Sequence, residues 1–336
     1  PVGQYILSEN NGEEFRSLGN VETEYQVPYV DGLSARLNLG YDVTTGEREL
    51  FQPTNLKQQA DADDPGLVQR YTFSRVTSLV DAYLSYDRRF EEISSQIEFT
   101  GGYSYQETNE EYPEFDITGL TTNIFEQNNA AAGTTQTANI TEIPSRLISG
   151  FGRLNYTFMD RYLLTLTVRR DGSSKFGPAN RWGTFPSAAL AWRVHQESFM
   201  EEVPYLSSLK LRGSWGVTGN QEIGDFLYEP IYVQGAGILR AQFGNEFVST
   251  VRPGAADRTV KWEETTQYNV GLDYGLLDDR ITGAVEYYRK DTDDLLFSVP
   301  APGGGNLSNE VLTNIGSMRN QGFEFSIDAQ VVNTTD

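Results

Sequence analysis

Side chains that catalyse reactions or bind metals are scarce in this sequence. Its 336 residues include no cysteine and a single histidine, His195. The lack of cysteine excludes disulfides, thiolate metal sites and cysteine nucleophiles, and one histidine argues against histidine-rich metal chemistry. The adjacent carboxylates Glu263 and Glu264 point to opposite faces of a strand, so they cannot act together on one bond. We therefore expect no enzymatic activity and no catalytic residue.

Two acidic clusters, DADD at 61–64 and DTDD at 291–294, are the best candidates for a metal site. Clustered carboxylates suit Ca²⁺, which takes about six to eight oxygen ligands. Neither cluster has the EF-hand spacing with its distal glutamate. Solvated loop charge is the better interpretation, so we expect no cofactor and no metal, with Ca²⁺ in an acidic loop as the less favoured alternative. The segments GPANRWG and APGGGN lack the Gly-Lys-Ser/Thr of a phosphate loop.

Composition excludes several classes of protein. The net charge of −21 disfavours nucleic acid and anionic membrane surfaces as partners. No apolar run approaches the length of about 18 residues that a transmembrane helix needs. No signal peptide is recognisable and the sequence opens at Pro1, so we expect a mature protein or a fragment of a longer one.

Apolar and polar residues alternate along most of the sequence, as in strands with two different faces. Leu164, Leu166 and Val168 fall on one side of such a strand, whereas Thr165, Thr167 and Arg169 fall on the other. Similar runs predict about eleven strands and no helix. The expected strands are 21–27, 35–43, 71–87, 93–105, 147–158, 162–171, 184–194, 208–217, 266–276, 281–291 and 321–331.

The connections between these strands alternate strictly between short and long. Short turns are expected at Asp87–Glu91, Met159–Arg161 and Leu277–Arg280, with modest links near 28–33 and 195–207. Long polar segments are expected at 44–70, 107–146, 172–183, 218–265 and 292–320. All long connections then leave one end of the sheet, which is typical of a membrane β-barrel with short periplasmic turns and long extracellular loops. A soluble sandwich would also alternate, but loops of this length are uncommon in it.

Several blocks resemble the SusC/RagA family of TonB-dependent outer-membrane transporters. The most specific are DGSSKFG at 171–177 with FPS at 185–187, and GVTGNQ at 216–221. The resemblance continues through WEETTQYNVGLDYGLLDDRITGAVEYYRKDTDDLLF at 262–297 and NIGSMRNQGFEFSI at 314–327, and YQVPYVDGLSARLNLGYD at 25–42 fits more loosely. Together these blocks cover most of the chain beyond residue 145.

The resemblance implies an all-β, antiparallel transmembrane barrel of about 22 strands with an N-terminal plug. About eleven strands are visible here, so we interpret residues 1–336 as part of one barrel domain that lacks the plug and the terminal strands. It also implies multi-pass localisation in the bacterial outer membrane, TonB-energised nutrient import, a SusD-like surface lipoprotein, and contact with TonB through the missing N-terminal part. The expected ligand is an oligosaccharide, with an oligopeptide next.

The two faces of the strands then meet different surroundings. Outward apolar residues contact lipid, where a charge costs about 2–4 kcal/mol at mid-depth. They are Leu164, Leu166, Val168, Leu209, Leu211, Val270, Leu272, Val285, Phe323, Phe325 and Ile327. The polar face lines the lumen, where most side chains contact the plug or water. The lumen-facing candidates are Arg36, Asp42, Gln96, Glu98, Arg169, Lys210, Arg212, Asp273, Glu286, Glu324 and Asp328.

Aromatic and amide side chains in the long loops are candidates for ligand binding, because rings stack on apolar ligand faces and amides bind polar edges. We select Trp182, Trp215, Asn220, Gln221, Tyr228, Tyr232 and Trp262. Packing of a loop on itself, or anchoring at the membrane interface, is the stronger alternative for any single one of them. Two other functions remain open, namely a soluble β-rich carbohydrate-binding or hydrolase domain, and an adhesin or scaffold barrel.

Overall fold

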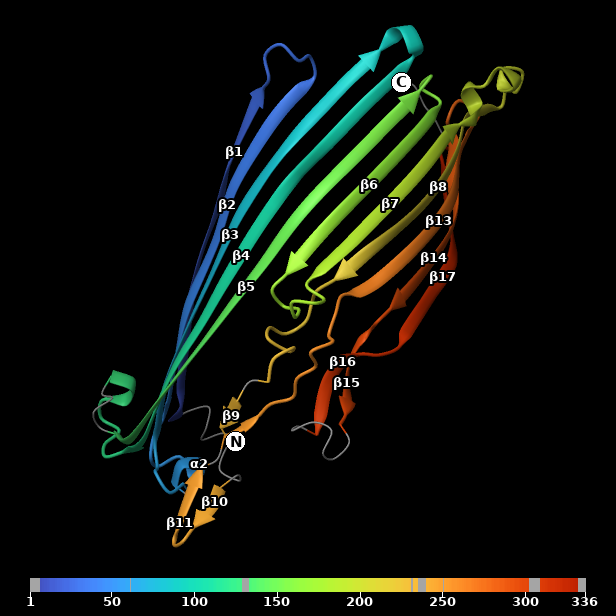
Figure 1. The fold of residues 1–336 in the computed structure, drawn as a ribbon. Coiled ribbons are helices and arrows are strands. Elements are labelled where there is room, and N and C mark those ends of the chain that lie inside the picture. Colours follow the sequence, from blue (N-terminus) through green and yellow to red (C-terminus); the bar gives the residue numbers. More distant parts are fainter. Residues whose placement is uncertain are drawn as a thin grey trace. The chain divides into compact units, whose positions relative to one another are not determined.

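One eleven-stranded sheet dominates the computed structural model, which describes residues 7–60, 62–128, 133–230, 232–234, 240–249, 251–301 and 309–331. The strands follow one another in the order β1-β2-β3-β4-β5-β6-β7-β8-β13-β14-β17 (Figure 1). Their bounds are β1 Glu9–Gln26, β2 Leu33–Gln52, β3 Leu67–Phe90, β4 Ser95–Leu120, β5 Gly133–Phe158, β6 Tyr162–Ser173, β7 Trp182–Arg193, β8 Leu206–Asn220, β13 Glu263–Leu276, β14 Ile281–Asp293 and β17 Ser317–Ala329. The pairs from β5 to β17 are antiparallel, which confirms the predicted architecture.

The long connections carry small elements of their own. Three two-stranded sheets pair β10 (Arg240–Phe243) with β11 (Glu246–Ser249), β9 (Tyr232–Gln234) with β12 (Val251–Pro253), and β15 (Leu296–Pro300) with β16 (Glu310–Asn314). The helical segments are α2 (Lys57–Ala60) and the 3₁₀ turns η1 (Glu91–Ile93), η2 (Glu126–Asn128), η4 (Val194–Gln196) and η5 (Ser198–Met200). Within the described ranges, none of these helices has the length and apolarity to cross a membrane.

Tight turns join the strands at one end, as the sequence predicted. Met159 and Asp160 adopt positive φ angles of 52° and 54° between β5 and β6. Gly32, between β1 and β2, has a φ of 84°, and a Cβ atom there would lie 1.9 Å from the carbonyl oxygen of Asp87. Only glycine fits this turn, because the position requires both a left-handed backbone and an absent side chain.

The first five strands are longer than predicted. β1 to β5 have 18, 20, 24, 26 and 26 residues, whereas the other sheet strands have 12 to 15. The predictions of loops over 44–70 and 107–146 are therefore wrong in part, since the actual connections are 53–66 and 121–132. The reason is that residues such as Thr45, Glu47 and Glu49 alternate with other polar residues, which leaves no apolar period to detect.

The chain divides into two compact units. The first unit contains the stretch that ends at Glu22, together with Asn38–Val80 and Tyr105–Arg146, and the second unit contains Thr23–Leu37, Asp81–Ser104 and the chain from Leu147 onward. The first unit has a small core of Phe51, Val68, Ile117 and Leu120. Its described residues belong mainly to β1 to β5 and to the connections that follow β2 and β4.

The strand register separates an apolar face from a polar face. Leu166 lies opposite Leu154 on β5 and Ala188 on β7, while Thr167 lies opposite Arg153 and Ser187. Directly opposed residues share a face of the sheet. We call the side of Leu166 the apolar face and the side of Thr167 the polar face. All eleven residues predicted to point outward lie on the apolar face.

The main core of the second unit is an aromatic cluster at the roots of the long connections. Phe176, Phe185 and Trp262 pack with Val260 and Ile223, and all five are buried. The ring centroid of Trp262 lies 5.0 Å from that of Phe176 and 5.3 Å from that of Phe185. The indole Nε1 donates a hydrogen bond of 3.1 Å to the carbonyl oxygen of Arg181, so its polar atom is satisfied. The blocks DGSSKFG and FPS thus supply a hydrophobic core.

We predict that Phe176→Ala destabilises the protein by about 3–5 kcal/mol, because the ring is fully buried and its removal leaves a cavity. Phe243→Ala is the matched control, since this ring is 69% exposed. The measurement is the free energy of unfolding of the purified protein in denaturant. Equal effects of the two substitutions would contradict the assignment of this cluster as a core.

Candidate functional site

Hydrogen bonds run laterally across four strands on the polar face. Gln96 Nε2 donates to Asp87 Oδ1 at 3.0 Å and to Glu98 Oε1 at 3.1 Å. Asn155 Nδ2 donates to Glu98 Oε2 at 3.2 Å, and Thr165 Oγ1 donates to Asn155 Oδ1 at 2.9 Å. The network therefore joins β3, β4, β5 and β6. Its members satisfy one another without leaving the sheet surface.

A second polar network is centred on Arg212. Its guanidinium lies 3.2 Å from Asp273 Oδ1 and 2.6 Å from Glu286 Oε2, and Asn269 donates to the other oxygen of Glu286. Beside it a hollow of about 360 Å³ is lined by Lys210 and Arg212 of β8, and by residues of β6, β7 and β13. A cation with two carboxylates beside a hollow can hold a polar group of a plug or a ligand.

The structure places each residue predicted to face the lumen. Arg169 bonds to Asp171 and Ser149 on the polar face, and Lys210 lines the hollow. Glu324 and Asp328 lie on the polar side of β17, opposite Glu286 and Thr282. That this face lines a lumen stays a prediction.

Two further candidates, Arg36 and Asp42, lie on one side of β2. Their partners on β1 are Glu24, at 2.9 Å, and Arg16, at 2.6 Å. Arg16 donates from Nε to Asp42 Oδ1 at 3.0 Å and from Nη2 to Asp42 Oδ2 at 2.6 Å, so this ion pair couples β1 to β2.

Aromatic rings line the apolar face at the short-turn end of the second unit. Successive ring centroids of Tyr156, Phe158, Tyr162 and Trp192 lie 6.2 to 6.5 Å apart, and Phe199 continues the row. Aromatic girdles of this kind mark the edge of the lipid-facing band in outer-membrane barrels. The row thus has the chemistry of an interfacial belt.

One carboxylate holds this belt in place. Glu197 Oε1 accepts hydrogen bonds from Trp192 Nε1 at 3.0 Å and from the hydroxyl of Tyr162 at 2.7 Å, while Oε2 lies 3.0 Å from Arg161. The bond from Trp192, followed by that from Tyr162, lowers the pKa of Glu197 below its usual value. The charged form of Glu197 is therefore favoured in the folded protein.

Charged residues mark the opposite limit of the apolar face. The guanidinium carbon of Arg170 lies 5.3 Å from the ring centroid of Trp182, and Asp291 pairs with Arg289 and Arg319. From Tyr162 to Arg170 a strand rises roughly 27 Å at about 3.4 Å per residue. A tilt of about 40° reduces this to roughly 21 Å, near the height of about 25 Å of the apolar band in outer-membrane barrels.

An antiparallel meander with one apolar and one polar face, short turns at one end and an aromatic belt defines a membrane β-barrel wall. Residues 3–334 match the family described as TonB dependent receptor-like, beta-barrel. The chain therefore belongs to the TonB-dependent receptor β-barrel family, which sits in the bacterial outer membrane. It is a SusC homologue, being 50% identical over 202 residues to the TonB-dependent receptor SusC of Bacteroides thetaiotaomicron. That match covers 60% of this chain and 20% of the relative.

Other relatives extend the match along the chain. A TonB-dependent receptor of Formosa agariphila is 30% identical over 339 residues, covering 98% of this chain and 32% of its own length. The structure of the RagAB peptide transporter aligns with a TM-score of 0.82 at 23% identity, covering 97% of this chain and 35% of that chain. The likeness to RagAB shows the fold. The chain spans about a fifth to a third of the length of the curated relatives it matches.

Three of the seven predicted loop residues lie in strands of the large sheet, because Trp182 begins β7, Trp215 lies within β8 and Asn220 ends β8. Trp182 is the first residue of β7 and lies opposite Gly172, whereas Trp215 lies within β8, opposite Ala188 and Tyr268. Both positions belong to the apolar face, so their prediction as loop residues is wrong. β7 begins two residues before the predicted strand 184–194 and so includes Trp182, whereas Trp215 already lay inside the predicted strand 208–217.

The other ligand candidates lie at the roots of the long connections. Trp262 is 5% exposed in the aromatic cluster and Tyr228 packs against that cluster, so loop packing describes both. Asn220 Oδ1 accepts from the backbone of Glu222 at 2.9 Å, beside the half-buried Gln221. The side chain of Tyr232 lies outside the described residues. A ligand-binding role for these residues stays a prediction.

The acidic clusters are engaged by cations and hydroxyls. Asp294 pairs with Lys261 at 2.7 Å, and Asp64 accepts from Thr135 at 3.0 Å, while Asp61 lies outside the described residues. Across the described ranges, no three metal-ligating side chains come together. Glu263 and Glu264 occupy successive positions of β13, opposite Asn220 and Gly219, and therefore point to opposite faces.

Sequence reasoning missed the amides that connect the polar networks. Asn155 and Asn269 each link a carboxylate of one strand to a neighbouring strand. The sequence could have identified both residues, because each lies between two apolar neighbours and its side chain therefore points to the polar face of its strand. The lumen-facing candidates were mostly charged residues, with Gln96 the one amide, and did not include these two asparagines.

We predict that Leu166→Arg blocks assembly of the protein in the outer membrane, whereas Thr167→Arg is tolerated. The first substitution places a charge on the apolar face, at a cost of about 2–4 kcal/mol at mid-depth, and the second adds one to the polar face. Folded protein in outer-membrane fractions can be counted by its heat-dependent shift in gel mobility. Equal yields would overturn the assignment of the faces.

We predict that acid weakens the belt through Glu197. Because its pKa is lower in the folded than in the unfolded protein, the stability it contributes is present above the unfolded value of about 4.3 and is lost as the pH falls through the folded value. The thermal midpoint of the wild type should therefore approach that of Glu197→Gln as the pH falls below about 4.3. The exposed Glu201→Gln serves as the control, and a constant gap at every pH would contradict this role.

Proposed function

We propose that the protein containing this chain imports an oligomeric nutrient across the outer membrane, through a plugged barrel energised by TonB. The observation that carries this proposal is the 50% identity to SusC over 202 residues, which is 60% of this chain. A SusD-like surface lipoprotein is the proposed partner at the long connections. In this arrangement the chain crosses the membrane many times.

The polar face supports a transport role better than a scaffold role. Its charges are paired laterally, so that Arg212 holds Asp273 and Glu286 within the sheet. Such a surface keeps its own hydrogen bonds when a plug or cargo moves past it. The hollow beside Arg212 gives a mobile polar group a place to bind.

A glycan is the favoured cargo, with an oligopeptide second. Aromatic and amide side chains near the long connections suit sugars, which present apolar faces and many hydroxyls. The peptide alternative is supported by the fold shared with RagAB, which is described as a peptide transporter. A soluble carbohydrate-binding domain is disfavoured because Phe323, Phe325 and Ile327 would expose an apolar strip to water.

We predict that cells producing the full-length protein accumulate a fluorescent neutral oligosaccharide, and that deletion of TonB lowers this uptake at least tenfold. The measurement compares labelled oligosaccharides and labelled oligopeptides in the same cells, with and without TonB. Uptake of peptides alone would replace glycan by peptide as the cargo. Uptake of neither would overturn import.

Extraction separates the remaining alternatives. An importer needs detergent to stay soluble and should co-purify with a surface lipoprotein, whereas a soluble binding domain stays folded without detergent. An adhesin barrel needs detergent too, but it binds partners without any accumulation of cargo.

A further inference from the structure

One arginine carries an unpaired charge on the apolar face, at the end of β6 next to the long connections. Arg170 is in phase with Leu166 and Val168, and it lies opposite Gly150 on β5 and Thr184 on β7. Its side chain is exposed, and neither of these opposed residues is charged. Among the described residues no carboxylate forms an ion pair with Arg170, so its charge is available to a ligand.

The indole of Trp182 supports this guanidinium. Trp182 lies opposite Gly172, and a Cβ atom on Gly172 would come within 2.8 Å of the indole ring. The missing side chain of Gly172 therefore lets the ring lie against β6. The guanidinium carbon of Arg170 lies 5.3 Å from the ring centroid, within the distance of about 6 Å of a cation–π contact. Arg170 itself stays exposed, so its N–H donors can still bind another group.

Arg170 differs from two other arginines at the same limit of the apolar face. Arg289 and Arg319 both pair with Asp291, so a carboxylate of the chain neutralises part of their charge. The strand from Tyr162 in the aromatic belt to Arg170 spans close to the height of the apolar band, which places Arg170 at its edge. The polar headgroups of membrane lipids begin at this edge.

Phosphate is the group that fits this arrangement best. The N–H donors of a guanidinium match two phosphate oxygens, and arginine is weakly hydrated compared with lysine. Thr184, exposed and directly opposite Arg170, adds a hydroxyl donor. Nothing lies within 4 Å of the position that a Cβ atom of Gly150 would occupy, so a headgroup can approach Arg170 from the side of β5.

The charge around Arg170 differs from that of the whole chain. The net charge of −21 disfavours anionic surfaces as partners in general. Exposed charges are screened beyond about 8–10 Å, however, so the immediate surroundings decide what Arg170 binds. Its sequence neighbour Asp171 points to the opposite face of the sheet, where it pairs with Arg169.

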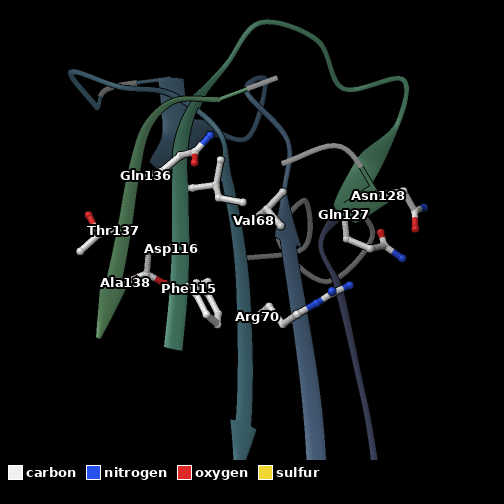
Figure 2. A pocket seen from close by; sticks show the side chains of 10 residues that line it. Val68, Arg70, Phe115, Asp116, Gln127, Asn128, Gln136, Thr137 and Ala138 are labelled. Carbon is white, nitrogen blue, oxygen red and sulfur yellow. The ribbon is translucent and has the colours of Figure 1, made fainter. Parts of the chain in front are cut away.

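A cavity of about 630 Å³ in the first unit offers no comparable charge (Figure 2). It is formed by the start of β3, the end of β4, the 3₁₀ turn η2 and the start of β5, with Phe115 in its wall. The one cation among its described lining residues, Arg70, pairs with Glu47 and Glu49. An anion would have to compete with these two carboxylates for Arg70.

We propose that Arg170, supported by Trp182, binds the phosphate of an anionic lipid in the leaflet next to the long connections. The site goes beyond the import of cargo, because it lies on the apolar face and shares no residue with the polar networks. It gives β6 a specific lipid contact directly before the DGSSKFG block at 171–177.

The test titrates the detergent-solubilised full-length protein with dioleoyl phosphatidylglycerol or dioleoyl phosphatidylcholine, and counts bound lipid by native mass spectrometry. Phosphatidylglycerol should bind more tightly, and Arg170→Gln should weaken its tightest binding about tenfold, because a charge-assisted pair is lost. Arg153→Gln is the matched control, since Arg153 is also an exposed arginine but lies opposite Thr167 on the polar face. Its affinity should stay within about twofold of the wild type.

Trp182→Leu tests the support of the guanidinium, because it removes the ring and keeps an apolar side chain. It should weaken the binding of phosphatidylglycerol about threefold, as expected for the loss of an exposed cation–π contact. Inorganic phosphate, added at the concentration of the lipid, should not displace the lipid.

Three results would overturn the proposal: the two lipids bind equally, inorganic phosphate displaces phosphatidylglycerol, or both arginine variants lose the same affinity. The heat-dependent shift in gel mobility shows that each variant is folded before it is titrated. Uptake of nutrients does not enter the measurement, so a failure of import would leave this test unaffected.

Discussion

The alternation of side chains across a hydrogen-bonded sheet is the constraint on which this molecule depends. Hydrocarbon offers no partner for backbone N–H and C=O groups, so a chain that crosses it as strands must pair every strand with a neighbour. Period-two alternation then commits one face to lipid and the other to polar contacts. Leu166 and Thr167, adjacent in the sequence, meet opposite surroundings for this reason alone. A shift of one residue in register would exchange them.

Charged side chains on the polar face form hydrogen bonds and ion pairs with residues of neighbouring strands, which offsets the free-energy cost of placing these charges on the sheet. Gln96 and Asn155 bridge carboxylates of neighbouring strands, and Arg212 holds two more. Each bond stays within the sheet, so the wall is satisfied before anything binds to it. The apolar face is bounded in a related way, because Glu197 fixes the aromatic belt at one limit and Asp291 pairs two arginines at the other. Structure and proposed transport therefore rest on the same separation of faces.

The sequence was most informative where one face is apolar. β6 and β14 were predicted to within two residues at each end. Apolar residues occupy alternate positions in both strands, with Leu164 in the first and Val285 in the second. β2 to β5 were predicted too short, since both of their faces become polar beyond the apolar stretch. The eleven charged or amide candidates were selected by phase alone and needed no tertiary information. Trp182 could not be placed that way, because it lies beyond the predicted start of its strand, and neither could the cavity beside Phe115, because contacts between four separate segments form it.

The aromatic cluster clamps the long connections at their roots. Phe176 comes from the connection after β6, Ile223 and Val260 come from the two ends of the connection after β8, and Leu296 packs against them from the connection after β14. The stretch between Ile223 and Val260 thus leaves and rejoins one fixed platform. Its sequence can diverge without disturbing the wall below. The DGSSKFG and FPS blocks therefore anchor the ends of this connection to the sheet, so the segment between the two anchored ends can change while the strands keep their positions.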